Sequence, residues 1–199
     1  GNHGTINGAT WYMEGCTDPL ADNYSPDATV DDGSCEYPDN GDYSLSFDGV
    51  DDYIDFSSGI IPSAGDFTVE CWVYGIESER DYMEILAQGS SNNAFFIGHE
   101  KETGYVRAGD GWNPSIPFPF NNSWNHIAIS KSANNTYLFI NGKLVAQLNN
   151  PIPNPAQSDY FIIGEQYNRH FNEAWYGYID EIRISNSSRY TDDFTPQDK

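Results

Sequence analysis

Oxygen-bearing side chains crowd the stretch from Gly15 to Tyr37, which reads GCTDPLADNYSPDATVDDGSCEY. Carboxylate and amide oxygens are the ligands that calcium prefers, so closely spaced acidic residues make this stretch a candidate calcium site. Their order does not follow the Asp-x-Asp-x-Asp-Gly loop with a distal Glu that defines an EF-hand. Because Asp and Asn side chains also hydrogen-bond their own backbone, plain turns are the alternative, and we favour them. The candidate calcium ligands are Asp18, Asn23, Asp27, Asp31 and Asp32.

The same stretch contains two of the three cysteines of the chain, Cys16 and Cys35. A disulfide between them would stabilise a segment that cannot build a core of its own, by roughly 3 kcal/mol on the chain-entropy estimate. The third cysteine, Cys71, lies in the apolar run FTVECWVYG and is expected to be a buried free thiol. A disulfide indicates an oxidising compartment, so we predict a secreted or cell-surface protein.

Two later loops combine aromatic rings with polar side chains in the manner of a sugar-binding site. Flat rings stack on pyranoses, while amides, carboxylates and guanidinium groups bind the hydroxyls. The alternative is that the rings fill the core, because the chain is 15% aromatic. We favour the second loop as the ligand site. The first loop supplies Tyr105, Arg107, Asp110 and Trp112, and the second supplies Tyr167, Asn168, Arg169, His170 and Trp175.

The charge of the chain narrows the classes of partner. Thirty acidic residues against nine basic ones give a formal charge of -21, which repels phosphate backbones and anionic membranes. We therefore expect no nucleic-acid partner. No apolar run approaches the roughly 20 residues that cross a bilayer, so no membrane insertion is expected either. Cations, neutral glycans and basic protein surfaces are the favoured partners.

The elements that must position these residues are strands. From residue 42 onward, short runs with period-two alternation are separated by Gly, Asn, Pro and Ser clusters, which predicts about eleven antiparallel strands in a sandwich or barrel. The Asn141-Gly142 dipeptide between two alternating runs predicts a hairpin with a type I′ turn. We expect three parts: residues 1–14 as a leader or residues added for expression, residues 15–38 as a disulfide-closed acidic module, and residues 42–196 as the sandwich. The first ten residues lack the pattern of a signal peptide.

The order of these runs resembles a laminin-G-like domain of the concanavalin A-like lectin and glucanase group. The resemblance covers residues 42–196 and depends on LSFDGVDDYIDF, WNHIAISK, YLFINGKLV and YGYIDEIRIS in the family's order. It implies an all-β jelly roll of two antiparallel sheets that binds carbohydrate or protein, frequently with calcium. The N-terminal stretch resembles short Cys-Thr-Asp-Pro…Asp-Asp-Gly-Ser-Cys modules found in large secreted proteins of marine bacteria and their phages.

The resemblance also implies a calcium site where the first and last strands of the sandwich pair. It places Asp48 and Asp180 side by side, with the carbonyl of Gly49 as a further ligand. The alternative is that Asp48 caps a turn and that Asp180 pairs with a nearby arginine. Asp51 and Asp52 are the reserve ligands if the geometry differs.

Catalysis is not expected. Glucanases of this fold carry Glu-x-Asp-x-Glu on one strand, so that two carboxylates face the cleft, and the chain contains no such run. Its four histidines are dispersed, and no nucleophile and base occur in a known catalytic arrangement. The prediction is a non-enzymatic, extracellular, calcium-dependent carbohydrate-binding module of lectin type. The alternative is an adhesion or structural module of a larger surface or phage fibre protein that contacts protein partners.

Overall fold

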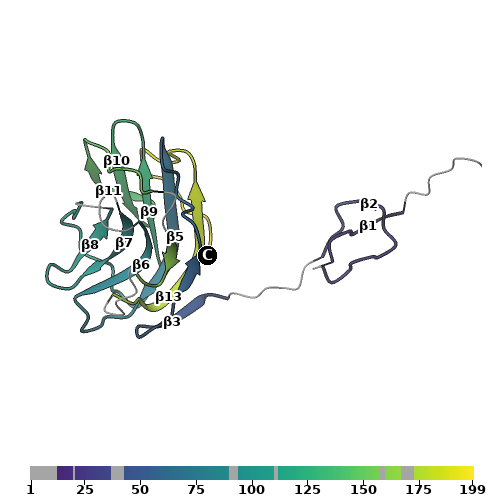
Figure 1. Cartoon of the computed structure of the whole chain (residues 1–199), viewed down its shortest axis with the longest axis horizontal. Coiled ribbons are helices and arrows are strands. Elements are labelled where there is room, and N and C mark those ends of the chain that lie inside the picture. The colour runs from purple at the N-terminus through teal and green to yellow at the C-terminus, as the bar shows by residue number, and fades with distance from the viewer. Residues whose placement is uncertain are drawn as a thin grey trace, which may run out of the picture. The chain divides into compact units, whose positions relative to one another are not determined.

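The computed structural model describes residues 13–19, 21–36, 43–89, 94–109, 112–156, 160–166 and 173–199. The chain divides into two compact units, Gly1–Tyr43 and Ser44–Lys199. The described residues form thirteen strands and no helix, so no helix that could span a bilayer is found among them (Figure 1).

The N-terminal unit is held by a disulfide rather than by a core. Cys16 and Cys35 are bonded, which confirms the predicted pairing. Beside this bond, β1 (Glu14–Gly15) and β2 (Val30–Asp31) form a parallel pair of two residues each. Such short pairing contributes little stability, so the covalent link is the main constraint on the fold of this unit.

The second unit is a sandwich of two antiparallel sheets, as predicted (Figure 1). The six-stranded sheet has the order β11 (Lys143–Leu148), β10 (Thr136–Ile140), β9 (Asn125–Lys131), β5 (Phe67–Gly75), β13 (Tyr176–Ser185) and β3 (Leu45–Asp48). The five-stranded sheet has the order β4 (Ile54–Phe56), β12 (Phe161–Ile163), β6 (Tyr82–Gln88), β7 (Phe95–Glu100) and β8 (Tyr105–Ala108).

The core lies between the two sheets and follows from period-two alternation. On β5 the inward side chains are Phe67, Val69, Cys71 and Val73, all essentially inaccessible to solvent. Each such apolar side chain contributes roughly 1.5–3 kcal/mol through burial, and a free Cys behaves as a small member of this set. Cys71 is a buried free cysteine, as predicted, and burial raises the pKa of its thiol to about 12.

The Asn141-Gly142 turn joins β10 to β11 as the sequence indicates. Both residues have positive φ, 51° and 72°, which is the type I′ geometry that suits the twist of a two-residue hairpin. A side chain at Gly142 would also collide with the carbonyl of Phe194, whose amide donates to the Gly142 carbonyl at 2.8 Å.

The outer face of the six-stranded sheet is covered by residues 186–199, which follow β13. Beneath this segment lies the buried carboxylate of Glu70, which accepts from Arg183 Nε at 2.7 Å and Tyr190 Oη at 3.1 Å and lies 3.2 Å from His126 Nε2. Burial alone would raise its pKa, but the hydrogen bonds from His126 and Arg183 outweigh burial and hold it at about 2. Much of this sheet face is thus occupied by the chain itself.

Candidate functional site

The outer face of the five-stranded sheet carries two rows of polar and aromatic side chains across β6, β7 and β8. Alternate residues of a strand share a face, and the pairing of the three strands brings equivalent positions into line. The first row is Tyr82, Glu100 and Tyr105, and the second is Glu84, Gly98 and Arg107.

Arg107 is the centre of this face. Its guanidinium carbon lies 4.3 Å from the ring centroid of Tyr82 and 4.3 Å from that of Phe96. A guanidinium group between two rings gains cation–π attraction while its edge remains able to donate hydrogen bonds. Nη1 pairs with Glu84 Oε1 and lies 3.8 Å from Glu173 Oε2. The arginine is thereby held in one orientation by both rings and carboxylates.

Glu84 is a fully buried carboxylate in the same cluster. Burial raises its pKa to about 8; Arg107 opposes this shift, whereas the neighbouring Glu173 and Glu165 add to it. Its Oε2 has no hydrogen-bond partner among the described residues. Gly98 is what makes room for it, since a Cβ at that position would collide with this same oxygen.

The two loops that the sequence offers as separate sites meet at this cluster. Arg107 comes from the first, and Glu173 comes from the second, which returns beside β6 so that the Glu84 amide donates to the Glu173 carbonyl at 2.7 Å. Tyr105 also lies on this face and is half-buried. Sequence reasoning missed Tyr82, Glu84 and Glu100, although their alternation within predicted strands is visible in the sequence.

The tryptophans of the two loops correct the predicted ligand set. Trp112 is 8% exposed and Trp175 is fully buried, with its ring 5.7 Å from that of Phe118 in the core. Neither ring is available to stack on a sugar, because both fill space between the sheets. The other predicted ligand residues, Asp110, Tyr167, Asn168, Arg169 and His170, lie outside the described residues.

A separate acidic cluster lies in the turn after β3. Carboxylate oxygens of Asp48, Asp51 and Asp52 lie within 4.8 Å of one another, and all three residues are exposed. Two backbone contacts shape the turn: Asp48 Oδ1 accepts from the Val50 amide at 2.7 Å, and Asp52 Oδ2 accepts from the Asp48 amide at 3.0 Å. Gly49 adopts a φ of 74° between them. These oxygens are of the type that calcium prefers.

Asp180 does not belong to this cluster, which corrects the predicted pairing with Asp48. The first and last strands of the sandwich do pair, but Asp48 lies opposite Tyr176 rather than opposite Asp180. Four strand positions separate Asp180 from that level, a distance of roughly 13 Å that one ion cannot bridge. Asp180 instead pairs with Lys199 at 3.5 Å.

The acidic residues of the N-terminal unit make turns. Asp31 Oδ1 accepts from the Gly33 amide at 3.0 Å, and Asp32 Oδ1 accepts from the Ser34 amide at 2.9 Å, as in Asx-turns. Asn23 uses both side-chain atoms to bind backbone, at Ser34 and Glu36. Within the described part of this unit, no three carboxylates lie close enough to share an ion. Asp18 and Asp27 therefore remain predicted ligands without a cluster around them.

The fold and the outer sheet face define a β-sandwich of the lectin type. Residues 48–193 match the model of the concanavalin A-like lectin/glucanases superfamily, and the chain belongs to this family. No curated protein matches the chain.

Solved structures of low sequence identity share the fold. Domain 4 of AbnA, a GH43 extracellular arabinanase from Geobacillus stearothermophilus in complex with arabinotriose, is 18% identical with a TM-score of 0.55, over 71% of this chain and 69% of that one. The native heptameric SAP-like pentraxin from Limulus polyphemus is 14% identical with a TM-score of 0.54, over 74% and 77% of the two chains. The CBM40 of the Ruminococcus gnavus IT-sialidase is 16% identical with a TM-score of 0.50, over 70% and 92%.

Proposed function

We propose that the sandwich binds a carbohydrate on the outer face of its five-stranded sheet, without catalysing a reaction on it. The observation that carries this proposal is the orientation of Arg107, held between the Tyr82 and Phe96 rings and paired with Glu84. A pre-oriented guanidinium group beside aromatic rings binds sugar hydroxyls at little entropic cost. Tyr82 and Tyr105 border the cluster and are the rings available for stacking.

The relatives and the chain chemistry support this proposal. Two structures of the same fold come from carbohydrate-active proteins, one of them with a bound arabinotriose. The Cys16–Cys35 disulfide is typical of an oxidising compartment and supports a secreted or cell-surface module. The charge of -21 favours a neutral glycan over a polyanionic one.

A glycan array probed with the whole chain tests the proposal. Glycans that bind are then titrated against Tyr82→Ala and Tyr105→Ala. Each variant should weaken binding about tenfold, because stacking of a sugar on one ring contributes on the order of 1–2 kcal/mol. Tyr178→Ala is the matched control, since Tyr178 lies on the other sheet and is 39% exposed. Equal losses in all three variants would reject this face as the site.

We further propose that calcium binds at Asp48, Asp51 and Asp52 and supports the loop end of the sandwich. A ligand that binds only the folded state stabilises it by roughly 2.7 kcal/mol at a hundred times its dissociation constant. Calcium should therefore raise the melting temperature by several degrees, and Asp51→Asn should remove most of that increase. Asp180→Asn should keep it. An increase that survives Asp51→Asn but disappears in Asp180→Asn would refute this assignment.

A second candidate function is adhesion to a protein partner, as part of a larger surface or fibre protein. It is favoured by the burial of Trp112 and Trp175 and by the exposed apolar side chain of Leu45 on the edge strand β3. Leu45→Glu would abolish such contact and leave glycan binding intact, which separates the two functions.

A further inference from the structure

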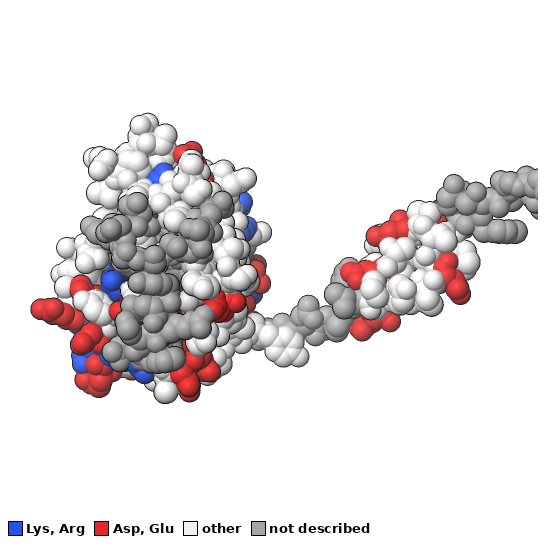
Figure 2. All heavy atoms as spheres, in the orientation of Figure 1, with Lys and Arg blue, Asp and Glu red and all other residues white. Residues whose placement is uncertain are grey.

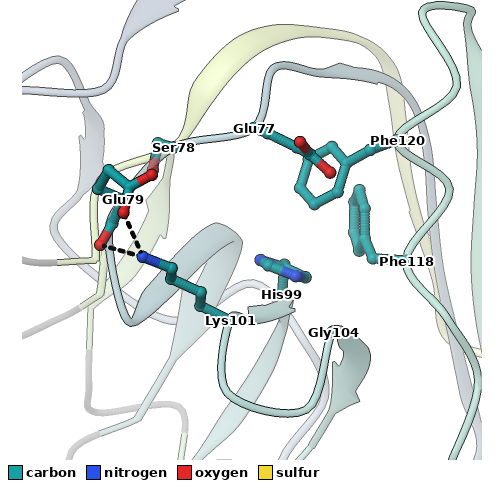
Figure 3. A pocket seen from close by; sticks show the side chains of 8 residues that line it. All are labelled: Glu77, Ser78, Glu79, His99, Lys101, Gly104, Phe118 and Phe120. Carbon is teal, nitrogen blue, oxygen red and sulfur yellow. Dashed lines mark hydrogen bonds and ion pairs between the residues drawn. The ribbon is translucent and has the colours of Figure 1, made fainter.

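A pocket of about 550 Å³ opens at the end of the sandwich where β5, β7 and β8 meet their loops (Figure 3). It is distinct from the proposed sugar-binding face, because its central residue, His99, points between the sheets while its neighbours on β7, Gly98 and Glu100, belong to the outer face. Figure 3 shows the His99 ring between the Lys101–Glu79 pair on one side and two phenyl rings on the other. The lining residues are Glu77, Ser78, Glu79, His99, Lys101, Gly104, Phe118 and Phe120.

The inner wall of the pocket is aromatic. The ring centroids of His99 and Phe120 are 4.7 Å apart, as are those of Phe118 and Phe120. Phe120 is half-buried, and Gly75 lets it pack closely, since a Cβ there would approach the ring to 2.7 Å. Part of this ring is therefore open to the pocket, and the face of an aromatic ring is the negative end of its quadrupole.

His99 contributes a polar ring to the wall of the pocket. The residue is 7% exposed, and its Nδ1 has no hydrogen-bond partner among the described residues. Burial lowers its pKa to about 4, so the imidazole is neutral at physiological pH. A neutral imidazole both donates and accepts hydrogen bonds. Nδ1 is itself buried, so a ligand hydroxyl group would bind at the exposed part of the ring.

The charge around the pocket favours a cation. Lys101 is already neutralised, because its Nζ lies 2.6 Å from Glu79 Oε2. Glu77 has no ion pair within the part of the chain that the structure describes. Acidic side chains gather toward the same end of the sandwich, at the bottom of the view in Figure 2. The neighbouring loops and strand ends supply Asp48, Asp51, Asp52, Asp81, Glu100 and Glu102.

We propose that this pocket binds a small organic ammonium ion that also carries a hydroxyl group, with the cation between the Glu77 carboxylate and the Phe120 ring and the hydroxyl at His99. An aromatic wall beside a carboxylate is the arrangement that recognises substituted ammonium groups. The same charges should disfavour a phosphorylated ligand, because the carboxylates around the pocket repel its phosphate group.

Choline and its uncharged isostere 3,3-dimethyl-1-butanol test the charge directly, because they have the same shape. Titration of the whole chain, followed by the amide resonances of Lys101 and Gly104, should show choline binding about tenfold more tightly than the isostere. Tetramethylammonium, which lacks the hydroxyl, should bind more weakly than choline, and phosphocholine should as well. Absence of choline binding, equal affinity of choline and the isostere, or tighter binding of phosphocholine would each overturn the proposal.

A pair of isosteric variants locates the site. Glu77→Gln should weaken choline about fivefold, because it removes the carboxylate next to the cation. Glu102→Gln makes the same charge change on an exposed residue of the adjacent turn that does not line the pocket, and it should leave the affinity unchanged. Equal weakening by both variants would show that choline responds only to the general acidity of this end and would reject the pocket. Both side chains are exposed, so both variants are expected to fold.

Discussion

Replacing Glu84 by Gln should change how the stability of the sandwich depends on pH. The folded pKa of Glu84, about 8, lies above its ordinary value of 4.5, so the folded state binds this proton more tightly than the unfolded state does. The free energy of unfolding therefore falls as pH rises from about 4.5 to about 8. The difference between the two pKa values corresponds to at most roughly 5 kcal/mol, at about 1.4 kcal/mol per pKa unit. Glu84→Gln removes the titrating group and should remove this decline.

Urea unfolding followed by tryptophan fluorescence at pH 5, 6, 7 and 8 measures the effect. The informative quantity is the stability of Glu84→Gln minus that of the wild type, which should grow by several kcal/mol across this range. His99, whose lowered pKa makes stability rise between about pH 4 and 6.5, contributes equally to both proteins and cancels. Glu102→Gln should follow the wild type. If the wild-type and Glu84→Gln profiles run parallel within about 1 kcal/mol, the reasoning on the buried carboxylate is wrong.

Three further outcomes are expected. Glu70, with a pKa of about 2, contributes stability above pH 4.5 that is lost as pH falls toward 2, so Glu70→Gln should flatten the acid limb of the unfolding profile and lower stability at pH 7 by roughly 2–3 kcal/mol. An unchanged acid limb would contradict the role given to its pairing with Arg183. A thiol reagent should leave Cys71 unmodified in the native protein and label it completely in denaturant; rapid native labelling would show that β5 is not in the core. Gly98→Ala should lower the melting temperature by several degrees, because its Cβ would displace the Glu84 carboxylate. A melting temperature equal to that of the wild type would show that the carboxylate relaxes freely.

Local patterns predicted the elements of the fold well. The apolar run FTVECWVYG identified β5 and the burial of Cys71, and Asn141-Gly142 identified the hairpin. These features depend on residues close in sequence, for which side-chain period and turn chemistry are sufficient. The disulfide followed similarly, because Cys71 belongs to a buried strand and leaves Cys16 and Cys35 as the pair.

Register and burial were harder to predict, because both depend on contacts between distant segments. The resemblance led to pairing of β3 with β13, which is correct, but the register places Tyr176 opposite Asp48. The pairing of β13 with β5 also shifts between Asp180 and Arg183, where Glu181 has a φ of 46°. Such a bulge leaves no distinct mark on alternation.

The arginine cluster shows the same limit. Arg107 was a predicted ligand residue, but its partner Glu84 lies on a strand two positions away in the sheet and 23 residues earlier in the chain. Only the pairing of β6, β7 and β8 brings them together. The burial of Trp175 could not be predicted either, because the sequence of an aromatic loop does not indicate which of its rings face solvent and which face the core.

The position of β13 between β5 and β3 has a consequence for folding during synthesis. The ribosome adds roughly 5–20 residues per second. β3 and β5 are therefore synthesised several seconds before β13, the strand that lies between them. Until residue 185 has emerged, β3 has no neighbour in its sheet and Glu70 lacks Arg183. The six-stranded sheet therefore cannot be completed before β13 has been made.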